Sequence, residues 1–251
     1  MTKTAEAKPA AELVFVTAVS RLDVFGRYLC QSPCISSGRR QLVAFFNAPS
    51  AAHAFNSTLD SLPADASSTW LVWVHQDVLL PGDWDELFLG ALRSAHGSMP
   101  SMAVAGVYGV ASAQANARRA GHVLDRGSPL REPAPLPCEV DSLDELLFAV
   151  RADTRLKLDP AMGFDFYATD LVLQAQARGA VAVVLDAYCE HWSDTPAGGA
   201  IPDRMAERIL RSGKAFEAKW SHRLPVETSW LKVQAPGDVE RFVSGLRNRQ
   251  P

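Results

Sequence analysis

Short apolar runs of strand length recur along the chain and alternate with segments of helical periodicity. Runs of about four to eight apolar and β-branched residues between turn-forming segments are typical of buried strands. Strands that alternate with helices form a mainly parallel sheet covered by helices on both faces. We therefore predict an α/β fold, a single αβα sandwich with a mainly parallel central sheet. The predicted strands are residues 13–19, 42–46, 70–74, 103–110, 146–150 and 181–185, and the predicted helices are residues 50–62, 84–96, 170–178 and 203–220.

The length and the charge of the chain limit its organisation and its partners. A chain of 251 residues buries a large core as one domain. We predict a disordered leader over residues 1–12, one domain over residues 13–235 and a C-terminal tail over residues 236–251. The formal net charge is −3, and the basic residues are scattered. We expect no nucleic-acid partner, because such partners need a concentrated basic surface.

Cysteine usage and hydropathy indicate the compartment. The four cysteines lack the paired spacing of a zinc finger, and in a chain of this length they are expected to be free thiols in a reducing cytosol. No apolar run reaches the roughly 18 residues of a membrane span, and the N-terminal residues lack the apolar core of a signal peptide. We predict a cytoplasmic protein without a transmembrane segment.

One long segment lacks a periodic pattern. Residues 111–137 are rich in Ala, Gly, Pro and Arg, which predicts a long loop with one hairpin near residues 121–127. The acidic residues Asp141, Asp144 and Glu145 that follow are typical of a solvated face.

Three polar residues, His75, Gln76 and Asp77, interrupt the apolar run that begins at residue 70. The carboxyl ends of strands are where open α/β sheets bind ligands. In an extended backbone, residues two apart point to the same side, so His75 and Asp77 can share one divalent cation. The alternative is an ordinary strand end, with His75 hydrogen-bonded and Asp77 capping a turn.

A set of segments in a fixed order resembles the glycosyltransferase family 2 pattern, and more closely its small bacterial branch with a His-Gln-Asp-Val signature. The resemblance covers roughly residues 13–195. It rests on Asn47 after the second strand, Ser50-Ala51-Ala52 and Asn56 on the next helix, His75-Gln76-Asp77-Val78 at a strand end, the segment from Gly163 to Asp170, and Glu190-His191-Trp192-Ser193.

The resemblance implies a GT-A-like fold with a metal that bridges the diphosphate of a nucleotide-sugar donor. The implied metal ligands are His75, Asp77 and His191. Family members usually carry Asp-x-Asp where this chain has His75-x-Asp77. Imidazole ligands favour Mn²⁺ over Mg²⁺, which prefers oxygen ligands.

The resemblance also implies a base and two binding sides. Asp170 stands at the family's position for the catalytic base, although Asp in the first turn of a helix is also a common capping residue. Thr169 replaces the glutamate that usually precedes this base. Three residues are expected to contact the donor and two the acceptor; these are Asn47, Asn56 and Gln76 for the donor, and Asp165 and Tyr167 for the acceptor.

These expectations define the leading function and its alternatives. The leading function is an inverting, metal-dependent transfer of a sugar from a nucleotide-sugar donor to a hydroxyl of a glycan, lipid-linked or protein acceptor in bacterial surface glycan synthesis. The first alternative is a nucleotide-sugar-binding or glycan-binding protein with a decayed site. The second is a metal-dependent phosphoesterase that uses the same His and Asp ligands. The sequence leaves the sugar, the nucleotide base and the oligomeric state open.

Overall fold

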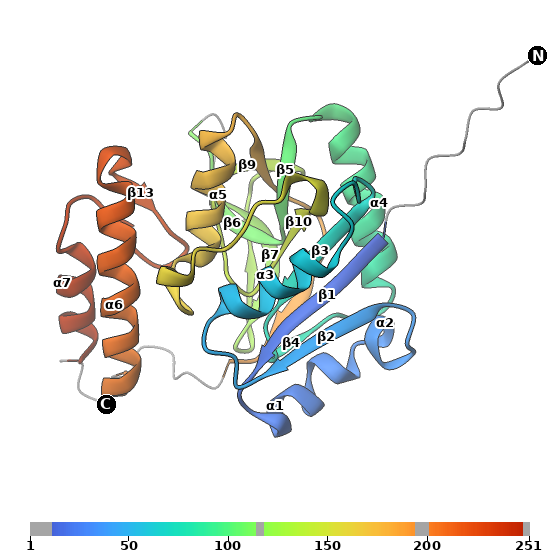
Figure 1. Ribbon diagram of the computed structural model, residues 1–251, viewed down its shortest axis with the longest axis horizontal. Coiled ribbons are helices and arrows are strands. Elements are labelled where there is room, and N and C mark those ends of the chain that lie inside the picture. The colour runs from blue at the N-terminus through green and yellow to red at the C-terminus, as the bar shows by residue number, and fades with distance from the viewer. Residues whose placement is uncertain (1–11, 114–117, 194–200, 248–251) are drawn as a thin grey trace, which may run out of the picture.

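A computed structural model describes residues 12–113, 118–193 and 201–247. The predicted leader lies outside the described residues except for Glu12, which begins the first strand. Figure 1 shows a large curled sheet with helices around it. The fold is therefore α/β, as predicted. The sheet strands are β1 (Glu12–Val19), β2 (Gln41–Phe46), β3 (Thr69–Val74), β4 (Val78–Leu79), β5 (Met102–Gly106), β6 (Tyr108–Ala111), β7 (Arg119–Asp125), β8 (Ser128–Arg131), β9 (Cys138–Leu143), β10 (Leu147–Arg151), β11 (Val181–Val184) and β12 (Cys189–His191).

The sheet is mixed, and the predicted parallel arrangement is present only in part. Its strand order is β2-β1-β3-β10-β5-β11-β9-β6-β7-β12-β4, with β8 paired to β7. Pairing is parallel in β2-β1-β3, in β5-β11 and in β7-β12. The other pairings are antiparallel, beginning with β10 between β3 and β5. The parallel end of the sheet is the part that the alternation of strands and helices describes.

Helices cover both faces of the sheet, because its strands are apolar on both faces. Leu13 and Phe15 belong to one buried cluster, and Val14 and Val16 belong to the other. The first cluster contains α4, and the second contains α3, α5 and α6. Two cores separated by a sheet make the layered arrangement that the sequence predicts. The helices are α1 (Leu22–Arg27), α2 (Pro33–Ser36), α3 (Ala51–Ser61), α4 (Trp84–Ser98), α5 (Tyr167–Ala177), α6 (Asp203–Trp220) and α7 (Asp238–Arg247), and the short 3₁₀ turns are η1 (Leu29–Gln31), η2 (Ala152–Thr154), η3 (Pro160–Met162) and η4 (Ser221–Arg223).

The predicted helices are present, with shifted boundaries. The Ser50 side chain caps α3 by accepting a hydrogen bond from the His53 backbone N–H at 3.1 Å. Helix α6 has the predicted bounds, whereas α5 begins at Tyr167 rather than at Asp170. Asp170 therefore lies in the first turn of α5.

The prediction of a long loop with one hairpin over residues 111–137 is met in part: the hairpin is present, but its strands are longer than predicted and extend the large sheet. The described part of this segment contains β7 and β8, which form a hairpin that turns at Arg126 and Gly127. Both turn residues have positive φ, 49° and 77°. The hairpin lies within the predicted region. The longer strands were not predicted because β7 also pairs with β6, a partner that glycine and proline content does not reveal.

The C-terminal part packs beside the sandwich. In Figure 1, α6 and α7 lie side by side at one edge of the molecule. A small sheet of β13 (Val226–Glu227) and β14 (Lys232–Val233) lies between them in sequence. The ring of Phe166, which precedes α5, packs on Phe216 and Trp230 with centroid distances of 5.1 and 4.9 Å. The predicted tail thus contains a helix, α7, that packs on the domain.

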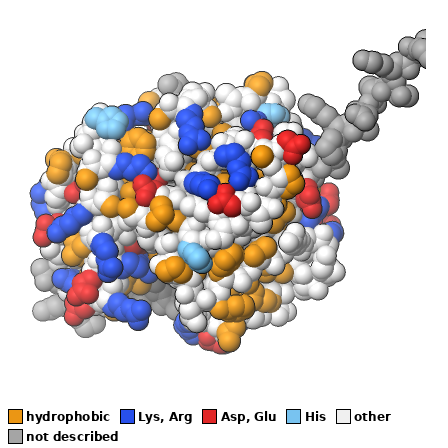
Figure 2. All heavy atoms as spheres, in the orientation of Figure 1, with side chains coloured by type: hydrophobic (Ala, Val, Ile, Leu, Met, Phe, Trp, Pro, Cys, Tyr) orange, Lys and Arg blue, Asp and Glu red, His pale blue; other side chains and the backbone are white. Residues whose placement is uncertain are grey.

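The surface composition, the helices and the cysteines can be compared with the sequence expectations. Figure 2 shows acidic and basic side chains interspersed on the visible face, and hydrophobic side chains gathered over α1 and β2, where Leu22 and Phe46 are exposed. None of the helices in the described ranges combines the length and the apolarity needed to cross a bilayer. The four cysteines are free, as predicted.

Candidate metal centre

Strand register brings His75, Asp77 and His191 together from two distant segments. His75 directly follows β3, and its backbone N–H donates to the Leu146 carbonyl at 3.0 Å. Asp77 lies between β3 and β4, and His191 ends β12. Because β12 pairs with β4, His191 lies opposite Val78. The Trp192 N–H also donates to the Asp77 carbonyl at 2.9 Å, so the ladder sets His191 beside Asp77.

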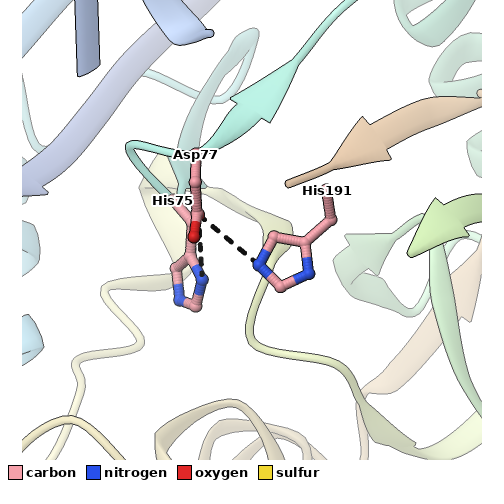
Figure 3. Close-up of side chains that lie close together, drawn as sticks. All are labelled: His75, Asp77 and His191. Carbon is pink, nitrogen blue, oxygen red and sulfur yellow. Dashed lines mark ion pairs between the residues drawn. The ribbon is translucent and has the colours of Figure 1, made fainter. Parts of the chain in front are cut away.

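A turn, not an extended strand, makes the first two side chains converge. The Val78 N–H donates to the His75 carbonyl at 3.2 Å, which folds residues 75–78 into a turn. His75 Nδ1 lies 3.9 Å and His191 Nε2 lies 3.4 Å from Asp77 Oδ1. One ligand atom from each of the three residues lies within 4.8 Å of the other two. Figure 3 shows both imidazoles facing the Asp77 carboxylate. The structure thus brings together the three predicted metal ligands.

Tyr167 holds the other nitrogen of the His75 ring. Its hydroxyl lies 2.7 Å from His75 Nε2 and 3.3 Å from the Glu145 carbonyl oxygen, to which it donates. The indole N–H of Trp73 donates to the same hydroxyl at 3.0 Å. In the His75 tautomer that could bind a cation, the hydroxyl accepts from His75 Nε2–H. This assignment leaves Nδ1 of His75 unprotonated on the side of Asp77.

Asp125 contacts the ring nitrogen of His191 that faces away from Asp77. Asp125 ends β7, and the parallel β7–β12 register places it opposite His191. Asp125 Oδ1 lies 2.8 Å from His191 Nδ1. A carboxylate on Nδ1 fixes the proton there and leaves Nε2 for a cation. Sequence reasoning missed Asp125, because it lies in the hairpin predicted within a long loop, and nothing there indicated a pairing with β12.

The two histidines differ in charge when no cation is bound. Burial lowers the pKa of His75 to about 4, although Asp77 opposes this shift. Burial also disfavours charge on His191, but its hydrogen bonds with Asp125 and Asp77 raise its pKa to about 10. The pKa of Asp77 is lowered despite burial by its hydrogen bond with His191. A protonated His191 therefore bridges two carboxylates, and a cation bound between them would have to replace the Nε2 proton.

The donor set fits a divalent transition ion. Two imidazole nitrogens and one carboxylate oxygen converge, and each imidazole is oriented through its second nitrogen. Imidazoles bind such ions well, whereas Mg²⁺ and Ca²⁺ prefer oxygen ligands. Orientation by groups behind the ligands is typical of metal-binding histidines. The geometry supports a metal centre and does not specify the ion.

Of the three predicted donor-binding residues, two have side chains that are hydrogen-bonded within the protein and one has an exposed side chain. Asn56 is tied to the backbone of Leu158, donating to its carbonyl at 2.8 Å and accepting from its N–H at 2.9 Å. Gln76 Oε1 accepts from the N–H groups of Ser20 and Arg21, both at 3.0 Å. Asn47 is exposed at the end of β2, in the left-handed region with φ 54°. Of the three residues, the structure leaves the side chain of Asn47 accessible.

The predicted acceptor residues are also engaged within the protein. Asp165 is buried and accepts two hydrogen bonds from the Arg208 guanidinium at 2.9 and 3.0 Å. Ser212 adds a third contact at 3.3 Å. Tyr167 is buried, and its hydroxyl contacts the His75 ring instead of facing solvent.

The carboxylate of the predicted base, Asp170, is enclosed. It is fully buried and accepts hydrogen bonds from Trp220 Nε1 at 2.8 Å and Gln174 Nε2 at 2.7 Å. Lys219 Nζ pairs with it at 2.7 Å. The expectation that Asp170 faces an acceptor is therefore not met, because α6 covers the carboxylate that the helix-start position was expected to expose.

Comparisons with known proteins add little to this geometry. No protein-family model matches the chain. The chain is 28% identical over 178 residues to the protein "ATP synthase subunits region ORF 6" of Fuscovulum blasticum, covering 67% of each chain. The crystal structure of A197 from STIV has a TM-score of 0.44 and 13% identity, covering 73% of this chain and 86% of that one. The functional assignment therefore depends on the site itself.

Proposed function

We propose that this protein is a metal-dependent glycosyltransferase with a GT-A-like architecture that uses a nucleotide-sugar donor. The observation that carries the proposal is the convergence of His75, Asp77 and His191 at a sheet end, with each imidazole anchored from behind. The parallel β2-β1-β3 unit ends at the same place, where α/β sheets bind nucleotides. The order of motifs along the chain, which resembles that of glycosyltransferase family 2 and includes these same three residues, agrees with the proposal.

The residues at this sheet end suit a nucleoside diphosphate. A bound divalent ion supplies Lewis-acid stabilisation of the negative charge on the leaving diphosphate. Gln76 clamps the turn after β1 through Ser20 and Arg21, so this turn is held next to the metal ligands. Asn47 presents a free amide at the end of the neighbouring β2. We assign the nucleotide to the space beside these two strand ends, with Mn²⁺ as the preferred ion.

The setting of the reaction belongs to the same proposal. Free thiols suit a reducing compartment, so we place the reaction in the cytoplasm. The proposed acceptor is a glycan, a lipid-linked acceptor or a protein in surface glycan synthesis. A two-metal phosphoesterase is disfavoured, since one candidate metal group is present in the described part of the chain.

Titration calorimetry with a panel of UDP-, GDP- and dTDP-sugars tests the proposal. We expect one class to bind in the presence of Mn²⁺ and to release its nucleoside diphosphate slowly. His191→Ala is expected to abolish metal-dependent binding. His122→Ala is the matched control, because His122 also pairs with a carboxylate, Asp186, but is not one of the three clustered residues. Absence of binding by every donor, with and without Mn²⁺, contradicts the proposal.

A second candidate is a nucleotide-sugar-binding protein that does not transfer. The enclosure of Asp170 by Trp220 and Lys219 favours it, because the family's base position then performs no proton transfer. Metal-dependent donor binding without any release of nucleoside diphosphate, across donors and acceptors, identifies this candidate.

A further inference from the structure

A cavity of about 540 Å³ lies between the large sheet, α5 and the C-terminal segment. This volume is within the range of roughly 300–1,000 Å³ that is typical of small-molecule sites. The sheet contributes the end of β6 and Asp141 of β9, and α5 contributes Leu173 and Gln176. The segment from η4 to β14 lines the other side. The three metal ligands do not belong to this lining, so the cavity is a separate candidate site.

Polar contacts between distant segments hold the walls of this cavity together. Arg223 Nη2 donates to Gln176 Oε1 at 2.9 Å, and Gln176 Nε2 donates to Asp141 Oδ1 at 3.1 Å. Arg118 Nη2 forms an ion pair with Glu227 Oε1 at 2.6 Å, which joins the residue before β7 to β13. The cavity is therefore bounded by several elements that contact one another, and not by a single loop.

The lining of the cavity carries more positive than negative charge. It contains three basic side chains and two acidic ones, a formal excess of one positive charge. Glu227 neutralises Arg118. Arg223 donates to a neutral amide, and Lys232 is exposed; neither forms an ion pair within the ranges that the structure describes. Two cationic side chains are therefore available to an anion.

Apolar side chains form much of the remaining wall. Val110, Ala111, Leu173 and Val226 line the cavity and are buried. Apolar walls with a few charged groups are typical of sites for small organic ligands. Arginine and lysine bind carboxylates and phosphates through charge-assisted hydrogen bonds. The lining thus suits a ligand that has an acidic group and an apolar body.

We propose that this cavity binds a small organic anion, with its acidic group at Arg223 and Lys232 and its apolar part against Leu173 and Val226. Carboxylates and phosphates share the required chemistry. Binding needs no metal ion, because the protein itself supplies the positive charge. It is also independent of the proposed sugar transfer, since no metal ligand lines the cavity.

Fluorescence titration with 8-anilinonaphthalene-1-sulfonate, an anion with an apolar ring system, tests this site. With a chelator present, we expect saturable binding of one dye molecule per chain. The double variant Arg223→Gln, Lys232→Gln is expected to bind the dye at least about 10-fold more weakly, because it lacks both charged donors. The double variant Arg93→Gln, Lys214→Gln is the matched control, because both residues are exposed and neither lines the cavity.

A neutral dye separates recognition of the charge from apolar binding. N-phenyl-1-naphthylamine has the same rings without the sulfonate. We expect it to bind the wild type at least about 10-fold more weakly than the anionic dye does, and to bind the double variant Arg223→Gln, Lys232→Gln as it binds the wild type. Lys232→Gln alone changes an exposed residue, and it provides the test if the double variant does not fold. This single variant is expected to weaken binding of the anionic dye by about threefold or more.

Three outcomes overturn the proposal. The first is the absence of saturable binding of the anionic dye to the wild type. The second is equal affinity of that dye for the wild type and for the variants that lack Lys232 or both charges. The third is loss of the dye signal in Phe46→Ser, which would place the dye on the exposed hydrophobic side chains at α1 and β2 instead.

Discussion

At the scale of single residues, the proposed metal centre depends on groups behind the ligands as well as on the ligands themselves. His75 and His191 each use one ring nitrogen for a partner inside the protein and turn the other toward Asp77. The partners differ in kind, a neutral hydroxyl for His75 and a carboxylate for His191. Asp125 therefore makes the His191 ring a stronger electron donor than Tyr167 makes His75.

Asp125→Asn tests this orienting role. We expect the Mn²⁺ affinity to fall by about 10- to 100-fold, because the amide orients Nδ1 less firmly and lacks the negative charge. Isothermal titration calorimetry of the folded variant measures the change. Asp60→Asn is the control, since Asp60 also loses ion pairs, with Arg155 and Lys157, on the distant helix α3. An affinity of Asp125→Asn equal to that of the control rejects the role.

The sequence predicts the ligands of this centre better than their surroundings. His75 and Asp77 were recognisable because they lie two residues apart at a strand end, and ligands bind at the ends of strands. His191 was added by the resemblance to glycosyltransferase family 2. The hydrogen bonds that hold Asp170 and Asn56 inside the protein could not be predicted. Their hydrogen-bond partners, Trp220 and Leu158, lie far away in the sequence. The residues next to Asp170 and Asn56 do not indicate these partners.

At the scale of elements, strand and helix signals predict what lies along the chain, but not every pairing. The strands β1, β2, β3 and β11 and the helices α3, α4 and α6 were predicted from periodicity, because each buries an apolar face of its own. The pairing of β7 with β6 and the antiparallel insertion of β10 between β3 and β5 depend on partners elsewhere in the sheet. Such pairings leave no periodic pattern in the strand itself.

Gly213 lets α6 and α7 approach closely, and its replacement tests that packing. A Cβ atom at this position would lie 2.3 Å from Val239 Cγ1. We expect Gly213→Ala to lower the free energy of unfolding by about 1–3 kcal/mol, measured by urea denaturation. Gly90→Ala in α4 is the control, because its added Cβ meets nothing within 4 Å. That control is expected to raise the free energy of unfolding by roughly 0.5–1 kcal/mol; equal effects of the two substitutions would contradict close packing at Gly213.

Asp170 joins α5 to α6, so its replacement is expected to affect stability rather than metal binding. Asp170→Ala removes the acceptor for Trp220 Nε1 and Gln174 Nε2 inside the protein. Lys219 retains its ion pair with Asp159 at 2.7 Å. We expect a loss of about 2–3 kcal/mol in the free energy of unfolding, with the Mn²⁺ affinity unchanged. Calorimetry and denaturation together check this; a stable variant that loses turnover alone would restore Asp170 as a catalytic candidate.

At the scale of the whole molecule, the proposed metal centre joins segments from three parts of the chain. The ligands come from the β3–β4 turn and from β12, and β7 supplies Asp125. A cation that binds the folded protein alone stabilises the whole fold by mass action.

Mn²⁺ at about 100 times its dissociation constant is expected to add about 2.7 kcal/mol to the free energy of unfolding. The measurement is urea denaturation with Mn²⁺ and with a chelator. His75→Ala is expected to lose this increment, while His122→Ala keeps it. An increment of the same size in His75→Ala would show that the ion binds elsewhere.

β12 is the last strand of the large sheet to be synthesised. On the ribosome, His75 and Asp77 emerge with an early part of the chain, while His191 is still to be translated. A nascent chain thus carries an incomplete set of ligands until β12 docks between β7 and β4. The proposed ion can therefore contact all three ligands only in a chain whose large sheet is complete.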